Sequence, residues 1–437
     1  MFQSIHKNLF SRPQLPPGKY LIRDYIYNAL YNPNYGYFNK YAKILKFNLD
    51  PKEIKDINHF DHLVAKIYQE AIRETWDINK NDLYKQLPKL TTSLWHTPSE
   101  LFSPIYGQLM ANYVIEQYEK RCKHKNCTIL EVGAGNATMM NDILDFIQRK
   151  RPDLYPRFKY QIVDISPFKI NTKHKNVSVV HDSILNLRKS TSEYHIVLLN
   201  EVLDNFAFDC IRFKNKEPYQ GYITYDPNAG LPNLVFTEDY TKLTDYQILK
   251  LFNFIDLQPS LLDTIKSKIP FSYSLSKPYF IPTQINYLFQ IIKTFLPNHS
   301  ILIADFDHLP DCIPGSNAPR IHAHVDGKAV TVPSLCVHPG PFDIFFPIDF
   351  QLMIDLYKQP DFFYPISSRI NQQYFSYSSN VDINLESQNS FKESPTLLSH
   401  KQFCQLYLKN CDHDFTLQDK SNPLLDFYQN FKVLTLN

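Results

Sequence analysis

The chain has 437 residues, of which 43% are hydrophobic and 21% charged, so it can build one elaborated domain or two. Its 46 basic and 44 acidic residues give a net charge of +2, which argues against a dedicated nucleic-acid-binding protein. The seven cysteines form no CxxC pair, which argues against a disulfide framework, and no apolar run reaches the roughly 18 residues of a membrane span.

The amino-terminal segment, residues 1–17, is basic and amphipathic. It carries Lys7 and Arg12, the first acidic residue of the chain is Asp24, and the apolar residues at 2, 5, 9 and 10 can share one helical face. Acid-poor amphipathic segments are typical of mitochondrial presequences, so we expect location in the mitochondrial matrix. An unremarkable basic tail is the alternative.

Residues 18–121 are predicted to form an amino-terminal helical region. A helix beginning near Ile22 should end at the Asn-Pro-Asn turn of residues 32–34, and residues 39–93 are predicted to be an inserted helical segment on the surface. A second helix is predicted from residue 97 to 121, with Thr97 as the N-cap and Glu100 completing a capping box.

Strands alternate with helices from residue 122 onward. The predicted strands are "TILEV" (128–132), "YQIVDI" (160–165), "VSVVHD" (177–182), "HIVLLNEV" (195–202) and "ILIADFD" (301–307). This alternation predicts an α/β fold with a mostly parallel sheet and helices on both faces. We expect residues 122–205 to form the cofactor-binding core and 206–295 an inserted cap. Residues 296–437 should complete the domain, with further strands that are antiparallel at one edge.

Two glycines stand two residues apart directly after the first strand. Gly133 and Gly135 would allow a tight turn and let a ligand approach the backbone, and the following helix offers free N–H groups. The third glycine of a dinucleotide fingerprint is absent because Thr138 stands there. Glu131, just before the loop, suits a cationic ligand, so S-adenosyl-L-methionine is favoured over a pyrophosphate.

Polar residues follow each of the next strands, where ligands of open α/β sheets bind. Each could be an ordinary strand-end cap, but together they predict one cofactor site. Asp164 is suited to the ribose hydroxyls, and Asp182 with Ser183 to the adenine edge. The predicted cofactor-binding residues are Glu131, Gly133, Gly135, Asn136, Thr138, Asp164, Ile165, Asp182, Ser183, Asn200 and Thr97.

The blocks "EVGAGNATMMNDIL", "YQIVDISP", "HDSI" and "NEVLDNF" resemble those of the MidA-like methyltransferases, and so do "IRDYIYNALYNPNYGYF", "TPSELFSPIYGQLMANYV" and "VHPGPFDIFFPIDF". That family is a class I, Rossmann-like branch of S-adenosyl-L-methionine-dependent enzymes and includes mitochondrial complex I assembly factors that are protein arginine methyltransferases. The resemblance implies this cofactor, a protein substrate such as a complex I subunit, and methylation of arginine. A homodimer is a further expectation, and no metal is required.

Glu201 is the predicted catalytic carboxylate, because it follows the fourth strand where the methyl group would lie. It would orient a guanidinium and accept its proton, with support from Asn200 and Asp204. The alternative for Glu201 is a helix-cap carboxylate without chemistry. Thr97, Glu100 and Tyr106 could close over the cofactor.

The sequence departs from the family pattern in the glycine loop. Ala134 stands for a proline, Asn136 and Ala137 for a basic-glycine pair, and "SLWH" (93–96) for a Gly-Asp-Phe block. These departures favour an alternative, an assembly chaperone that keeps the methyltransferase fold without turnover. A small-molecule or RNA methyltransferase is a third hypothesis, which no basic groove supports.

Two later motifs could carry chemistry. His322 and His324 in "RIHAHVD" would place both rings on one face of a strand, as some metal sites do, although a surface strand is favoured. Asp343 and Asp349 resemble the late family motif, and we expect them at an edge strand or a substrate channel.

Overall fold

The computed structural model describes residues 15–77, 92–122, 125–166, 170–189, 191–229, 235–259, 275–325, 328–359 and 394–437. The predicted presequence lies almost wholly outside the described residues. None of the helices in these ranges has the length and apolar character needed to cross a bilayer.

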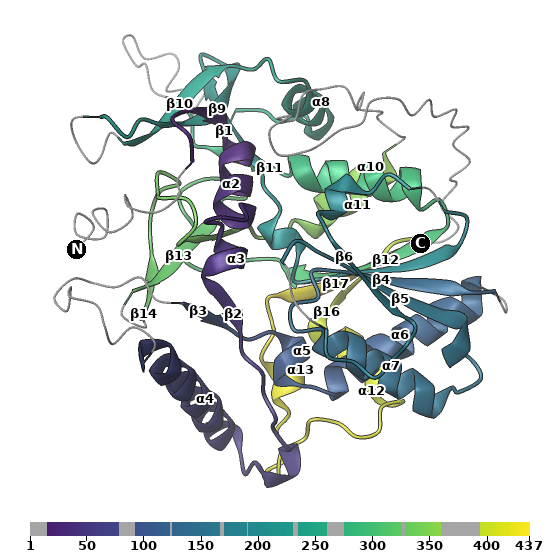
Figure 1. The fold of residues 1–437 in the computed structure, drawn as a ribbon. Helices are drawn as coiled ribbons and strands as arrows, with labels where there is room; N and C mark the ends of the chain where they lie inside the picture. The colour runs from purple at the N-terminus through teal and green to yellow at the C-terminus, as the bar shows by residue number, and fades with distance from the viewer. Residues whose placement is uncertain are drawn as a thin grey trace.

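A seven-stranded sheet forms the centre of the molecule (Figure 1). Its strands in spatial order are β16 (Thr396–Ser399), β17 (Phe431–Leu436), β12 (His299–Phe306), β7 (Tyr194–Asn200), β4 (Cys127–Val132), β5 (Phe158–Asp164) and β6 (Val177–His181). The last five are mutually parallel, which matches the predicted alternation. β17 is antiparallel to β12, as predicted, but it is not an edge strand because the unpredicted β16 pairs with its other side.

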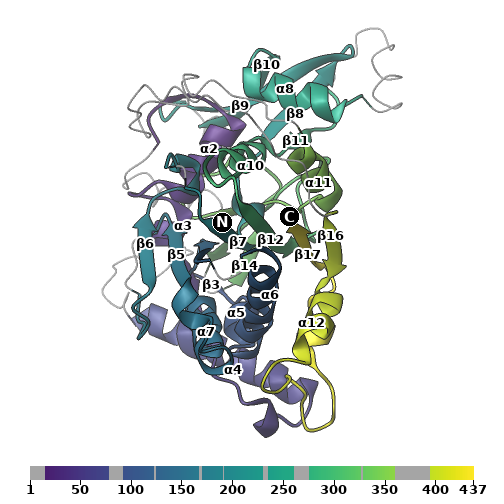
Figure 2. The same cartoon turned by 90° about the vertical axis from the view of Figure 1, so that its right-hand side faces the viewer.

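Alternate side chains of the central strands enter two separate cores. In β4, Ile129 belongs to one core and Leu130 to the other, and every residue of the strand is buried. On one face lie α6 (Ile105–Arg121), α7 (Thr138–Lys150) and α12 (His400–Leu408), and on the other lie α10 (Thr283–Phe295) and α11 (Phe350–Lys358) (Figure 2). Helices therefore cover both faces, which explains why the central strands are continuously apolar.

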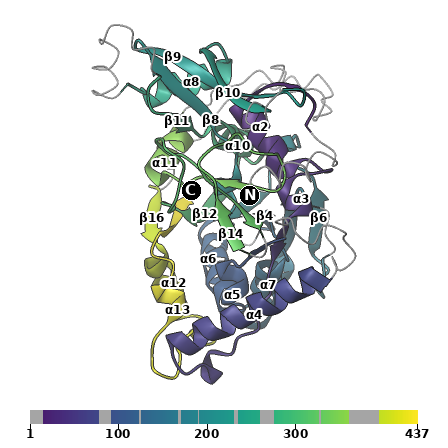
Figure 3. The same ribbon diagram turned by 90° about the vertical axis from the view of Figure 1, so that its left-hand side faces the viewer.

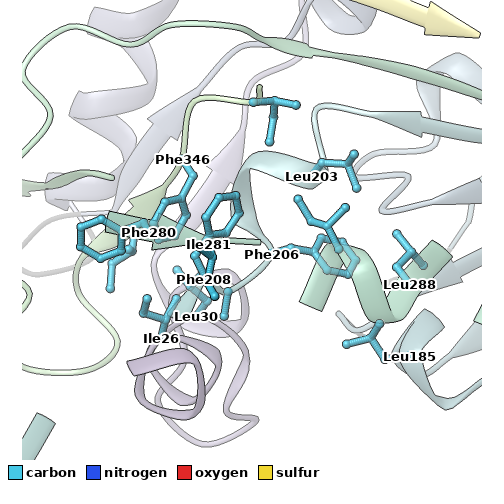
Figure 4. Packing of buried hydrophobic residues seen from close by; sticks show 14 of the residues in the cluster. Ile26, Leu30, Leu185, Leu203, Phe206, Phe208, Phe280, Ile281, Leu288 and Phe346 are labelled. Atoms are coloured by element: carbon cyan, nitrogen blue, oxygen red, sulfur yellow. The ribbon is translucent and has the colours of Figure 1, made fainter. Parts of the chain in front are cut away.

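A second, antiparallel sheet packs beside α2 (Ile22–Tyr31). Its order is β1-β9-β8-β11 with β10 paired to β9, and the strands are β1 (Gly18–Leu21), β8 (Asp209–Lys214), β9 (Glu217–Tyr225), β10 (Phe236–Lys242) and β11 (Tyr279–Ile281). Aromatic side chains join this sheet to the rest of the core (Figure 4): Phe208 stacks on Phe346 with ring centroids 4.1 Å apart.

The end of the predicted cap, α10, does not belong to a cap. Ile285, Leu288 and Ile292 of this helix pack in the same core as Val197 and Leu199 of β7. α10 covers the parallel sheet and precedes β12, as the alternation of strands and helices predicts, although the range expected for the cap included this helix.

The segment 39–93 contains one long helix, α4 (Ile57–Asp77), which lies across the lower part of the molecule in Figure 3. The predicted surface location is wrong for part of the segment: Phe60 is 1% exposed and packs on Phe102 and Phe415. A short strand of the same segment, β2 (Ala42–Ile44), pairs with β3 (Ser93–Trp95).

The predicted helix 97–121 is two helices, α5 (Pro98–Leu101) and α6. A third sheet, ordered β14-β13-β15, contains β13 (Arg320–Val325), β14 (Lys328–Thr331) and β15 (Asp343–Phe345). Strands in this part of the chain were predicted at an edge of the main sheet. This was wrong for β14 and β15, because both pair with β13. Within the described ranges, the remaining helices are α3 (Tyr37–Lys40), α8 (Tyr246–Ile255), α13 (Pro423–Asp426) and the 3-10 turns η1 (Pro51–Glu53), η2 (Tyr155–Arg157), η3 (Ile184–Asn186) and η4 (Leu203–Asn205).

Candidate functional site

The glycine loop between β4 and α7 needs bare backbone at two positions. Gly133 and Gly135 have φ values of +69° and +54°, in the left-handed region that glycine tolerates best. A β-carbon on Gly133 would lie 3.0 Å from Cγ2 of Val202, and one on Gly135 would lie 2.8 Å from Cδ1 of Ile44. The loop is thus packed between the residue after Glu201 and the strand β2.

Asp164, at the end of β5, is brought directly to this loop. Its carboxylate accepts a hydrogen bond from the backbone N–H of Ser166 at 2.8 Å and is also bonded by the N–H groups of Ala134 and Gly135. Burial raises the pKa of this carboxyl, and the three N–H groups act against that shift. The predicted ribose ligand and the predicted glycine loop therefore lie together.

Glu131 lies inside the sheet layer rather than on the loop surface. It is 3% exposed, and its Oε2 accepts a hydrogen bond from the Tyr160 hydroxyl on β5 at 2.9 Å. Burial raises the pKa of Glu131 to about 7. Sequence reasoning missed Tyr160, and the expected role of Glu131 toward the cofactor stays a prediction.

Asn200 and Glu201 form a hydrogen-bonded pair where β7 ends. The Tyr106 hydroxyl donates to Asn200 Oδ1 at 2.8 Å, and Asn200 Nδ2 donates to Glu201 Oε1 at 3.3 Å. Glu201 has a φ of +51°, and its N–H donates to the Ala304 carbonyl at 2.8 Å. Burial raises the pKa of Glu201 well above its usual range, and Asp305 adds to the shift.

Asp305, which the sequence analysis did not single out, fixes the loop that carries the predicted catalytic residues. It is fully buried, and its Oδ2 accepts hydrogen bonds from the N–H groups of Leu203 at 3.0 Å and Asp204 at 3.3 Å. Its position near the carboxyl end of the predicted strand "ILIADFD" could have indicated that Asp305 lies at the same edge of the sheet as the other strand-end residues. Asp204 itself is 7% exposed, and no described residue forms a hydrogen bond with its Oδ1.

The predicted adenine-side residues lie at the neighbouring strand. Asp164 pairs with His181 in the register of β5 and β6, so Asp182 and Ser183 follow at the same edge of the sheet. Asp182 Oδ1 accepts from the N–H of Ser183 at 2.7 Å, and Ser183 Oγ caps η3. Ile165 follows Asp164 and is half-buried.

Asn136 and Glu100 connect the glycine loop to the amino-terminal region. Asn136 Nδ2 donates to the Ile44 carbonyl at 3.2 Å and to Glu100 Oε1 at 3.1 Å, and Glu100 is also bonded by Thr138. Thr97 is the N-cap of α5, as predicted, with its Oγ1 accepting from the N–H of Glu100 at 3.3 Å. The predicted capping box is absent because the Glu100 carboxylate turns to the loop.

His322 is not on a surface strand. It is 3% exposed, and its ring lies 4.8 Å from that of Trp95 and 5.7 Å from that of His324. Burial lowers the pKa of His322 to about 3, which keeps the ring neutral. In the part of the chain that the structure describes, no three His, Cys, Asp or Glu side chains are arranged to hold a metal ion.

A family profile described as "Putative S-adenosyl-L-methionine-dependent methyltransferase" matches residues 109–364, more than half of the chain. The chain belongs to this family. As an S-adenosyl-L-methionine-dependent methyltransferase it uses S-adenosyl-L-methionine as its cofactor. The match covers the glycine loop, β7 and β12, and therefore the strand ends described above.

Known proteins resemble this methyltransferase over much of its length. A relative from Schizosaccharomyces pombe, named protein arginine methyltransferase NDUFAF7 homolog, mitochondrial, is 22% identical over 333 residues, which are 69% of this chain and 67% of the relative. A Burkholderia thailandensis structure bound to S-adenosyl-homocysteine superposes with a TM-score of 0.55 at 12% identity, covering 96% of this chain and 88% of the other. A second structure from that organism, covering 96% and 87%, gives 0.53 at 11% identity. At these identities, the solved structures support the fold alone.

Proposed function

We propose that this methyltransferase modifies arginine side chains of a protein in the mitochondrial matrix. The observation that carries the proposal is the contact between two loops: a β-carbon on Gly133 would meet Val202, so the glycine loop lies directly beside Glu201. The predicted cofactor loop therefore contacts the residue that follows Glu201, which supports the proposed site. The name of the fission yeast relative supports both the arginine substrate and the mitochondrial location.

The glycine loop fits the cofactor because the backbone is open where a side chain would otherwise stand. Gly133 is exposed and left-handed, and the residues around it at the strand ends, Asp164, Ile165 and Asn200, are half-buried and within reach of solvent. We assign the sheet to the class I arrangement, with Asp164 toward the ribose and Asp182 and Ser183 toward the adenine. Glu131, Asn136, Thr138 and Thr97 complete the proposed binding set.

The chain's own residues orient the acceptor nitrogen and remove its proton. When bound, the cofactor would supply an electrophilic methyl carbon on a sulfonium sulfur, and that sulfur would keep the electron pair of the C–S bond when the methyl group passes to the guanidinium nitrogen. Glu201 accepts the proton that the guanidinium nitrogen loses, because a carboxylate with a raised pKa is a better base than an ordinary one. Asn200 holds Oε1 of Glu201, and Tyr106 holds Asn200.

An assembly chaperone without turnover is the second candidate. Two observations favour it: the amide of Asn136 is engaged by Ile44 and Glu100, and Ala137 keeps a β-carbon in a left-handed conformation with a φ of +59°. Asn136 and Ala137 stand where the family pattern has a basic residue and a glycine, so the loop differs from that pattern in both its contacts and its backbone freedom. A role with complex I, and a homodimer, stay proposals under either function.

The two functions are separated by measuring cofactor binding and turnover on the same protein. Isothermal titration should show binding of S-adenosyl-L-methionine by the wild type, and a radiolabelled methyl assay on mitochondrial matrix extract should give methylarginine after acid hydrolysis. Glu201→Gln should keep the affinity and lower the labelling rate by about 100-fold or more, the range for loss of a general base. Binding without any labelling would favour the chaperone.

A further inference from the structure

Four carboxyl groups gather behind the end of β7 without a cation among them. They are Glu201, Asp204, Asp305 and Asp343, and the groups that act on them are one another, backbone N–H groups and neutral side chains. Of the ion pairs formed by described residues, none involves any of the four. Burying carboxylates without a counter-ion costs free energy, so this arrangement favours binding of a positively charged group from a substrate.

Asp204 is the carboxylate that such a positively charged group would bind. Its side chain is 7% exposed, and Oδ1 has no hydrogen-bond partner within the described ranges. The backbone on either side is fixed, since the Asp204 N–H donates to Asp305 and the Asp204 carbonyl accepts from Phe346 N–H at 2.8 Å. A rigidly held, buried acceptor that lacks a hydrogen-bond partner is suited to pair with a cationic donor.

Asp343 is the second carboxylate and is held by neutral donors. Asn205 Nδ2 donates to its Oδ1 at 3.2 Å, and the Tyr37 hydroxyl is also bonded to the carboxylate. Tyr37 in turn accepts from Trp95 Nε1 at 2.5 Å. Asn205 follows Asp204 in η4, so this network places the two carboxylates next to each other, and they interact electrostatically.

The aromatic ring of Tyr31 lies next to these two carboxylates. The Tyr31 hydroxyl donates to the Asn205 carbonyl at 3.0 Å. Burial raises the pKa of this phenol well above its usual range, and the negative charges of Asp204, Asp343 and Asp164 add to the shift. The ring stacks on Phe38 with centroids 5.4 Å apart and an interplanar angle of 17°. Both rings are half-buried, so this side of the cluster is within reach of solvent.

We infer that Tyr31, Asp204 and Asp343 receive the side chain that is methylated and select a guanidinium over a primary amine. A guanidinium is flat, can stack on a phenol ring and presents several N–H donors in one plane to two carboxylates. An ammonium is a compact point charge that is more strongly hydrated, so it gains less from the ring and the paired acceptors. This inference rests on the proposed arginine substrate and adds the residues that choose it.

The test compares labelling by the wild type and by Asp343→Asn and Tyr31→Ala on the same mitochondrial extract, prepared from cells that lack the enzyme. Asp343→Asn should form methylarginine at least 10-fold more slowly, since a charge-assisted hydrogen bond contributes about 1.5–3 kcal/mol. Tyr31→Ala should be slower by about 2- to 30-fold, since a cation–π contact contributes about 0.5–2 kcal/mol. Their affinity for S-adenosyl-L-methionine should stay within about two-fold, and Tyr31→Phe, which keeps the ring, should recover most of the rate. Glu217→Gln, an exposed residue on β9, is the matched control.

The outcomes separate this inference from the proposed function. A wild type that forms methylarginine, with Asp343→Asn and Tyr31→Ala equally fast, would overturn the inference alone. A wild type that labels lysine or no protein at all would overturn both. A loss of cofactor affinity in Asp343→Asn comparable to its loss of rate would also contradict the inference, because it would place the residue at the cofactor.

Discussion

Ala137 carries a β-carbon at a backbone position that usually suits glycine. Its φ is +59° and ψ +26°, it is the residue before α7, and it is fully buried. The left-handed conformation costs a residue with a β-carbon about 1–2 kcal/mol. The surrounding core offsets part of this cost, because the methyl group is buried among apolar side chains.

We therefore predict that Ala137→Gly leaves the free energy of unfolding nearly unchanged. Relief of the left-handed strain should offset the loss of a buried methyl, about 0.8 kcal/mol, and the greater freedom of glycine in the unfolded chain, about 0.4–1 kcal/mol. Ala111→Gly is the matched control, since Ala111 is equally buried but lies within helix α6. Urea unfolding should show the control to be destabilised by about 1–2 kcal/mol more. Equal losses at both sites would contradict the assigned conformation.

The buried carboxyl groups predict an unusual dependence of stability on pH. Burial raises the pKa of Asp343 to about 7, whereas an aspartate in an unfolded chain titrates near 4. Between these values the folded protein binds more protons than the unfolded chain. The contribution of protonated Asp343 to the free energy of unfolding is therefore fully present below about pH 4 and is lost as pH rises through about 7. His299 and His400, whose pKa values burial lowers to about 4, act with the opposite sign.

Asp343→Asn reports this contribution together with the part of the Asp204 shift that Asp343 causes, because the remaining titrating groups are common to both proteins. The free energy of unfolding of the wild type minus that of the variant should fall between pH 5 and pH 8, by at most about 1.4 kcal/mol per pH unit. Urea unfolding of cofactor-free protein at pH 5, 6, 7 and 8 measures it. A constant difference across that range would show that Asp343 titrates normally.

At the scale of elements, Arg23 joins the amino-terminal helix to the antiparallel sheet. Its Nη1 lies 2.7 Å from Asp209 Oδ2 on β8, and its Nη2 lies 2.8 Å from Asp245 Oδ2, the N-cap of α8. Arg23 is 6% exposed and Asp209 fully buried, so removing the cation leaves a buried charge without its partner. This ion pair fixes α2 and thereby Tyr31 at its far end.

Arg23→Met should lower the free energy of unfolding by about 3–5 kcal/mol, the usual cost of breaking a buried pair from one side. Adding Asp209→Asn should recover part of the loss because the uncompensated carboxylate is removed. Lys120→Met removes the same charge from an exposed pair with Glu116 and should cost at most about 1 kcal/mol. Thermal and urea unfolding would both report the difference, and equal effects of Arg23→Met and Lys120→Met would contradict it.

The sequence identified those elements whose signal is local. The strands of the parallel sheet are short continuous apolar runs, and β4 and β7 were predicted to within a few residues. β16 was missed because "TLLS" alternates poorly and is fixed by pairing with β17, far along the chain. Phe60 was placed on the surface because its partners, Phe102 and Phe415, are 42 and 355 residues away in sequence.

For the whole molecule, the same distinction applies to the site. The positions of Asp164, Asn200 and Glu201 at one edge of the sheet could be predicted since each directly follows or ends a recognisable strand, and parallel strands bring such ends together. Ile44 and Asp305 could not, because their roles depend on tertiary contacts with the loops at residues 133–138 and 200–204. Tyr106 was expected over the cofactor, but its bond to Asn200 was not foreseen. The proposed site is therefore assembled from segments spread from residue 31 to residue 343.

This arrangement predicts that binding of the cofactor product slows hydrogen exchange in segments outside the glycine loop as well as within it. Hydrogen exchange of the full chain with and without S-adenosyl-homocysteine should show slower exchange at 133–138, 164–166 and 200–205, because ligands suppress local opening of the loops they contact. Residues 42–46 and 97–100 should be protected as well, since Asn136 bonds Ile44 and Glu100. β10, an edge strand of the other sheet, is the internal control and should exchange at an unchanged rate. Protection confined to 133–138 would show that the amino-terminal region packs against the loop without responding to its ligand.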